Sequence, residues 1–144
     1  LGIDIIQTEV HDATKLKEEY VEKFDKILLD VPCLGLGVIR RKPDIKWNRQ
    51  EEDIKEISDI QFNILKTCSK YLKRNGTLVY STCSMLKEEN DAIIEKFIKE
   101  ENFETVNIEE QIPNEFSKIT TNNMVQFLPS QNHDGFFITM LKKI

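Results

Sequence analysis

Two cysteines, Cys33 and Cys83, follow short apolar segments, Lys26–Val31 and Thr77–Ser81, that have the composition of buried strands. Asp30 precedes the first cysteine by three residues. In an open α/β sheet, ligands bind outside the carboxyl ends of the strands. If the two strands are parallel, two thiols and a carboxylate reach the same edge of the sheet, and such a group suits a reaction with a cysteine nucleophile.

Position alone leaves two explanations open for each thiol. Cys83 lies just before a predicted helix start, where a thiolate is favoured, and hydroxyl side chains flank it. A free cysteine is, however, more commonly a small buried hydrophobic residue. Cys68 lies on the apolar face of a predicted helix, so we expect it to pack in the core. Asp12 follows a predicted first strand, Ile3–Val10, and is expected at the same edge as Asp30.

Metal and thiol-hydrolase chemistry have weaker support. The sequence has no Cys-x-x-Cys pair, and His11 and His133 have no ligand partner at the usual spacing, so we expect no metal site. A thiol hydrolase needs a histidine base near the cysteine, and only these two histidines exist. His11 adjoins Asp12, but a surface histidine at a strand end explains it equally well.

Composition indicates a water-soluble globular domain. The chain has 144 residues, 40% hydrophobic and 31% charged, which is enough for one domain with a core. No apolar run approaches the roughly 20 residues needed to span a bilayer, and no secretory signal is recognisable. We therefore expect a cytoplasmic protein whose three cysteines are free thiols.

A net charge of −5 gives no overall case for nucleic-acid binding, but one segment is basic. Within ten positions it carries an aromatic residue and five cations, with only Asp44 opposing them. These residues are Arg40, Arg41, Lys42, Lys46, Trp47 and Arg49. A solvated loop would explain the charges, whereas cations beside an aromatic ring also suit single-stranded RNA.

Hydrophobic periodicity and turn signals divide the chain into alternating elements. The segments expected to be strands are Ile3–Val10, Lys26–Val31, Thr77–Ser81, Phe103–Ile108, Met124–Leu128 and Phe136–Leu141. The segments expected to be helices are Lys15–Phe24, Glu51–Lys73, which precedes the stop signal Asn75-Gly76, and Lys87–Glu101. Leu34–Asn48 and Gln111–Asn123 are expected to be loops. This order predicts an α/β three-layer sandwich with a mostly parallel sheet and an antiparallel C-terminal edge.

Three motifs resemble those of RNA cytosine-5 methyltransferases. Asp30–Gly37 resembles the family's Asp-Ala-Pro-Cys-Ser-Gly-x-Gly motif, Ser81–Ser84 its second cysteine motif, and Asp134–Phe137 its closing strand. Val38–Trp47 is similar to the subfamily of bacterial 16S rRNA cytosine-5 methyltransferases B, the Sun or Fmu type. The resemblance covers most of the chain and implies a Rossmann-like, S-adenosylmethionine-dependent methyltransferase fold acting on ribosomal RNA.

The resemblance also implies residue roles. Cys83 would be the nucleophile that adds to carbon 6 of the target cytosine, and Cys33 would assist breakdown of the adduct. Asp30 would bind the base or the cofactor, and Asp12 would face the adenine side of S-adenosylmethionine. Pro32 would shape the base pocket. RNA contacts would come from the basic segment, namely Arg40, Arg41, Lys46 and Trp47.

Two departures from the family pattern lie in the first motif, where Val31 replaces alanine and Leu34 replaces serine. The family's glycine-rich cofactor loop and ribose-binding acidic residue would precede Leu1, as would an amino-terminal RNA-binding extension. We therefore expect residues 1–144 to be the C-terminal portion of a catalytic domain that is truncated at its N-terminus, lacks the first two strands and is inactive alone.

Two rival functions remain. The chain could be a non-enzymatic remnant that binds RNA through its basic segment. It could instead belong to an amino-methylating nucleic-acid methyltransferase of the same fold. Cys33 and Cys83 argue against the second rival, because methylation of an exocyclic amine needs no thiol.

Overall fold

The computed structural model describes residues 2–116 and 118–144. Leu1 of the expected domain and Ser117 of the expected loop Gln111–Asn123 lie outside the described residues. The strands are β1 (Phe24–Asp30), β2 (Leu72–Thr82), β3 (Phe103–Val106), β4 (Lys118–Thr121), β5 (Met124–Phe127) and β6 (Phe136–Lys143). The α-helices are α1 (Ile45–Asn48), α2 (Glu51–Ser69) and α3 (Asp91–Glu100). Short 3₁₀ helices are η1 (Glu18–Tyr20), η2 (Leu36–Val38), η3 (Lys87–Glu89) and η4 (Glu109–Gln111).

The six strands form one mixed sheet. Its order is β1-β2-β6-β5-β4, and β3 pairs with β6 beyond the end of β5. The β1–β2 pair is parallel, with Asp30 opposite Ser81, as expected for strands joined through the crossover helix α2. Every other pairing in the described chain is antiparallel. The predicted antiparallel C-terminal edge is confirmed, and it makes up more of this sheet than the prediction of a mostly parallel sheet implied.

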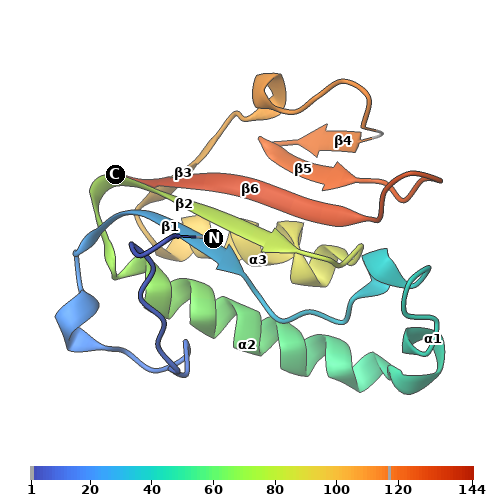
Figure 1. Cartoon of the computed structure of the whole chain (residues 1–144), viewed down its shortest axis with the longest axis horizontal. Helices are drawn as coiled ribbons and strands as arrows, with labels where there is room; N and C mark the ends of the chain where they lie inside the picture. The colour runs from blue at the N-terminus through green and yellow to red at the C-terminus, as the bar shows by residue number, and fades with distance from the viewer. Residues whose placement is uncertain (1, 117) are drawn as a thin grey trace.

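Both long helices lie on the same face of the sheet, below it in Figure 1. Alternate residues of the strands face these helices, because successive side chains of a strand point to opposite sides. The fully buried members of this core are Leu65, Leu72, Leu78, Tyr80, Ile94, Phe97, Phe137 and Leu141. The core thus fixes α2 beneath β1 and β2, the two strands that carry the cysteine motifs.

Helix α2 begins as the sequence predicts but ends earlier. A capping box joins Gln50 to Asp53 at its start. The predicted end at Lys73 is wrong, since α2 ends at Ser69 and Leu72 already pairs with Phe24 in the sheet. Residues 73–76 form an irregularity in β2, where Asn75 has a φ of 63°. The dipeptide Asn75-Gly76 therefore shapes a bulge in β2 and not a helix end.

The two N-terminal predictions are wrong. Residues Ile3–Val10 form no strand, and Ile5 and Val10 are 88% and 104% exposed. A strand needs a neighbour to satisfy its backbone groups, and these residues have none in the described sheet. The predicted helix Lys15–Phe24 contains only η1. Tyr71 instead holds this segment, because the Lys17 N–H donates to its hydroxyl and the Phe24 N–H to its carbonyl.

Two predicted loops contain secondary structure. Leu34–Asn48 includes η2 and α1, while Gln111–Asn123 includes η4 and β4. β4 forms a hairpin with β5 across Asn122 and Asn123, which have φ values of 51° and 64°. Asparagine tolerates this left-handed conformation, which two-residue hairpin turns of type I′ require. The predicted strands in Phe103–Ile108, Met124–Leu128 and Phe136–Leu141 are confirmed as β3, β5 and β6.

Candidate active site

The structure brings Cys33 and Cys83 into contact. Their Sγ atoms are 2.8 Å apart, although the residues are 50 positions apart in the sequence. Each thiol follows one strand of the parallel pair β1–β2, so the two motifs leave the sheet side by side. Both side chains are half-buried.

The contact separates the protonation behaviour of the two thiols. The hydrogen bond from Cys33 lowers the pKa of Cys83 to about 7, while burial opposes this shift. The same hydrogen bond, with burial, raises the pKa of Cys33 far above its ordinary value. Near neutral pH the pair therefore tends to carry one negative charge on Cys83 and one proton on Cys33. A thiolate is the reactive form of cysteine, so Cys83 has the chemistry of a nucleophile.

Asp30 lies at the same edge of the sheet. Its side chain is exposed and its Oδ1 accepts a hydrogen bond of 2.9 Å from the Ser81 hydroxyl. Its charge is also one of the influences that raise the pKa of Cys83, which indicates that the carboxylate lies near that sulfur. The structure thus groups Asp30, Cys33 and Cys83, as the sequence motifs suggested.

Asp12 is not brought to the two thiols. Its carboxylate accepts hydrogen bonds from the hydroxyl and N–H of Thr14, which lower its pKa. The carbonyls of Thr14 and Lys15 accept hydrogen bonds from Thr67 and Tyr71, at the C-terminal end of α2. That end of α2 adjoins the start of β1 and β2, whereas the thiols lie beyond the opposite ends of these strands. The role of Asp12 toward a cofactor remains a prediction.

Gly37 joins the loops around the thiols. Its N–H donates to the Cys83 carbonyl at 2.8 Å, and its own carbonyl accepts from the Gly135 N–H at 2.9 Å. A Cβ at position 37 would lie 2.3 Å from the Gly135 oxygen and 2.7 Å from the Cys83 oxygen. Only glycine permits this approach, which fastens the two cysteine loops to the loop before β6.

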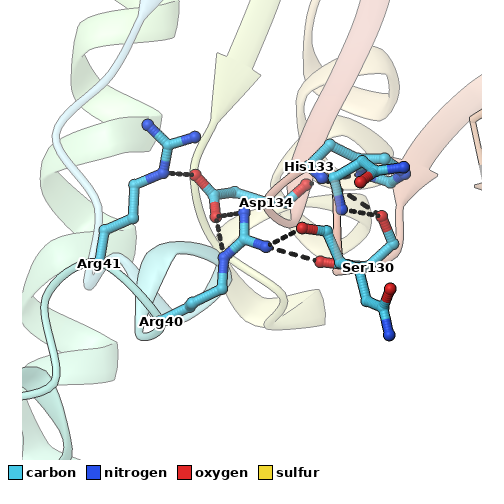
Figure 2. A network of polar contacts seen from close by, with 7 residues as sticks. Arg40, Arg41, Ser130, His133 and Asp134 are labelled. Carbon is cyan, nitrogen blue, oxygen red and sulfur yellow. Dashed lines mark hydrogen bonds and ion pairs between the residues drawn. The ribbon is translucent and has the colours of Figure 1, made fainter.

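The basic segment is attached to that same loop, as Figure 2 shows. Asp134 accepts a hydrogen bond of 2.9 Å from Arg40 and forms an ion pair with Arg41, with 2.6 Å between the nitrogen and the oxygen. Arg40 also donates to the carbonyls of Ser130 and Gln131. The guanidinium of Arg40 is therefore engaged in hydrogen bonds within the protein.

The other residues of the basic segment with predicted RNA contacts are more accessible than Arg40. The side chain of Arg41 is 67% exposed and Trp47 is 81% exposed, and Lys46 is exposed as well. The predicted RNA contacts of these residues remain predictions. Pro32, predicted to shape a base pocket, is exposed immediately before Cys33.

Sequence reasoning missed a buried polar network beneath the thiols. Glu89 is fully buried, and its carboxylate accepts hydrogen bonds from Leu34, Gln61 and Ser84. In the sequence Glu89 belongs to an acidic pair with Glu88, which resembles a solvated surface. The one available signal was Gln61, a polar residue on the apolar face of the predicted helix.

Comparison with known proteins identifies the family. The sequence model described as 16S rRNA methyltransferase RsmB/F matches residues 1–142. The chain belongs to the RsmB/F family. The predicted resemblance to bacterial 16S rRNA methyltransferases of the B type is thereby confirmed as membership of this family. The chain is 42% identical over 147 residues to the probable ribosomal RNA small subunit methyltransferase B of Bacillus subtilis (strain 168), covering 99% of this chain and 33% of that protein. It is 54% identical over 77 residues to ribosomal RNA small subunit methyltransferase B of Shewanella oneidensis, covering 54% of this chain and 18% of that protein.

Solved structures confirm the predicted fold class for this RsmB/F chain. The crystal structure of PH0851 superposes with a TM-score of 0.88 at 32% identity, covering 99% of this chain and 32% of that one. NSun6 from Pyrococcus horikoshii, solved with SFG, gives a TM-score of 0.81 at 31% identity, covering 99% and 35%. The fold is therefore the Rossmann-like α/β fold of methyltransferases. The chain spans about a third of the length of most of these relatives.

Two further features concern the described residues only. They include no helix long and apolar enough to cross a membrane. They also contain no cluster of three or more histidine, cysteine, aspartate or glutamate side chains arranged to hold a metal ion.

Proposed function

We propose that this chain supplies the nucleophile and the base pocket of an enzyme that methylates carbon 5 of a cytosine in small-subunit ribosomal RNA. The observation that carries the proposal is the 2.8 Å contact between the two sulfurs, which makes Cys83 the better thiolate. Membership of the RsmB/F family supports ribosomal RNA as the substrate. Methylation of an amino group needs no thiol, so it would not explain why the two cysteines are paired.

The proposed chemistry begins with the Cys83 thiolate. Its sulfur adds to carbon 6 of the cytosine, and the electron pair of the 5,6 double bond makes carbon 5 nucleophilic toward a methyl donor. After methylation, carbon 5 loses its proton to a base and the bond between carbon 6 and sulfur breaks, which restores the double bond. Covalent catalysis of this kind divides one difficult step into two easier ones.

Cys33 acts in the breakdown of the adduct. Its pKa is raised, so it remains a thiol that can donate a hydrogen bond to the Cys83 sulfur as that sulfur leaves. A donor at this place stabilises the departing thiolate, because a hydrogen bond to the charged form lowers its free energy. This role agrees with the one that the family resemblance implies.

S-adenosylmethionine would supply the methyl group when bound. Asp30 fits this group, because its exposed carboxylate beside the thiols can accept hydrogen bonds from a cationic amine or a hydroxyl. Asp12 would face the adenine side, as the resemblance implies. For the RNA, Arg41, Lys46 and Trp47 offer exposed cations and an aromatic face, while Arg40 positions the loop that carries Asp134.

An RNA containing 5-fluorocytidine at the target position tests the nucleophile. Fluorine blocks loss of the carbon-5 substituent, so an attacking cysteine stays bonded to the RNA. We expect the complete enzyme to form an adduct that resists denaturing electrophoresis, and Cys83→Ala to abolish it. On normal RNA, Cys33→Ala should accumulate a covalent complex.

Cys68→Ala is the matched control, because this third thiol packs in the core away from the sheet edge. An adduct that persists in Cys83→Ala would end the nucleophile assignment. If Cys33→Ala merely unfolds the domain, the role of Cys33 is packing.

A further inference from the structure

The buried carboxylate of Glu89 is bonded to both cysteine loops. Its Oε2 accepts a hydrogen bond of 2.9 Å from the backbone N–H of Leu34, which follows Cys33. Its Oε1 accepts a short hydrogen bond from the hydroxyl of Ser84, which follows Cys83. Leu34 and Ser84 are 4% and 0% exposed, so water cannot replace these contacts. One side chain thus spans two loops that lie 50 residues apart in the sequence.

Gln61 of α2 completes the link on the side of Cys33. Its Nε2 donates to Glu89 Oε2 at 2.9 Å and to the Pro32 carbonyl at 2.8 Å. The backbone is therefore fixed on both sides of Cys33, through Pro32 and Leu34. On the other side, the Ser84 N–H donates to the Thr82 hydroxyl at 3.1 Å, so the residues flanking Cys83 are fixed as well.

The energetics favour a geometric role over an electrostatic one. A buried carboxylate is costly unless it is fully hydrogen-bonded, and Glu89 has no cationic partner among the described residues. Its charge raises the pKa of Cys83 and thus works against the thiolate. What Glu89 contributes is a set of hydrogen bonds to a carboxylate, which are stronger than those between neutral groups.

We propose that Glu89 is a positioning residue, which holds the two cysteine loops at the separation where the Cys33 thiol reaches the Cys83 sulfur. The catalytic meaning of this inference rests on the proposed function, but the geometry can be tested separately. Glu89 touches neither substrate nor reacting atoms, and it acts through Leu34 and Ser84.

Three variants of the complete enzyme separate the possible roles. Glu89→Leu removes every acceptor and leaves the Leu34 N–H unpaired. Glu89→Gln keeps the shape, because its amide oxygen can accept from Leu34 and Gln61 while its NH₂ donates to Ser84. Glu88→Leu is the matched control, since Glu88 precedes it in the chain and is exposed.

Phenylarsine oxide reports the separation of the thiols without any methylation, because its arsenic atom is chelated by two sulfurs that lie close together. Cys33→Ser defines the background affinity with the pair broken. We expect Glu89→Leu to bind the arsenical roughly 10²-fold more weakly than the unmodified enzyme, because chelation depends on the effective concentration of the second thiol. Glu89→Gln and Glu88→Leu should retain the affinity.

Steady-state kinetics give the second readout. We expect Glu89→Leu to lower kcat about 10²-fold, as misplacement by about 1 Å can, with little change in KM for RNA. Glu89→Gln should restore most of the rate. A folded Glu89→Leu enzyme with unchanged arsenical affinity would overturn the proposal. If that variant does not fold, Ser84→Ala replaces it, and unchanged arsenical affinity there has the same consequence. The two proposals can also fail separately. If Glu89→Leu loses arsenical affinity while the unmodified enzyme forms no adduct with 5-fluorocytidine RNA, the positioning role is upheld and the proposed function is rejected.

Discussion

At the scale of single residues, the two thiols differ because they share one hydrogen bond. Cys83 has its pKa lowered to about 7 by that bond, while Cys33 keeps its proton. An attacking thiol works best when its pKa is near the ambient pH, because a lower pKa gives more thiolate but a weaker nucleophile. The pair therefore suits a nucleophile that must both add to a base and leave it.

This pairing predicts the effect of Cys33→Ala on the titration of Cys83. The hydrogen bond stabilises the charged form and so lowers the pKa, and its removal should raise the pKa of Cys83 from about 7 toward the ordinary 9.0. Thiolate absorbance at 240 nm against pH measures the change, in a Cys68→Ala background that removes the third thiol. A midpoint that stays near 7 would show that Cys33 is not the cause.

The site residues differ in how far the sequence could predict them. Cys33 and Cys83 were found because each follows a strand directly, and strand ends are local features of the sequence. Glu89 was missed because its burial depends on Leu34 and Gln61, which lie 55 and 28 residues away. A charged residue beside another charge gives no local sign that it is buried.

At the scale of elements, the site depends on Gly37, where the loop after β1 contacts the loop after β2 and the loop before β6. A side chain there would collide with backbone oxygens on both sides, and backbone cannot rotate away as a flexible side chain can. We expect Gly37→Ala to lower the free energy of unfolding by about 1–3 kcal/mol, the usual cost of overpacking. Urea denaturation with an unchanged m-value measures this loss.

Gly2→Ala provides the control for Gly37→Ala. Position 2, unlike position 37, has a positive φ, of 64°, and a Cβ there has nothing within 4 Å. It lies in a segment that pairs with no strand. Equal denaturation midpoints for the two variants would contradict the role of Gly37 as a packed junction.

Prediction of the elements succeeded where a segment carries its own pattern. β1, the start of α2 and β6 have clear apolar periodicity, and each was found. The segment Ile3–Val10 has the pattern of a strand but no neighbouring strand in the described sheet, so pattern alone was insufficient. The end of α2 was misplaced because Asn75-Gly76, which is typical of a helix end, instead lies in an irregular part of β2, where Asn75 adopts the left-handed backbone.

At the scale of the whole molecule, the outer edge of strand β1 has no neighbouring strand in the described sheet. β1 pairs only with β2 among the described strands, and Leu28 on β1 is 71% exposed. Exposed strand edges with apolar residues favour association with further strands. Asp30 is the last residue of β1, and Cys33 follows three residues later. The candidate site therefore lies next to the exposed edge of β1.

We therefore expect the isolated chain to bind S-adenosylmethionine poorly and to be inactive. Of the two carboxylates proposed for the cofactor, only Asp30 lies beside the thiols. The five glycines of the sequence are scattered and do not match the family's glycine-rich cofactor loop. Titration calorimetry on the chain and on the complete enzyme measures the difference. Micromolar affinity for the isolated chain would contradict this expectation.

The position of β6 has a consequence for local opening of the protein. This strand lies inside the sheet, with β2 along one side and both β5 and β3 along the other. The Gly135 N–H that donates to the Gly37 carbonyl comes immediately before β6, so it keeps its place only while β6 stays paired with β2. Transient detachment of β6 would therefore also release the two cysteine loops, so the thiol pair shares the opening free energy of a strand in the middle of the sheet.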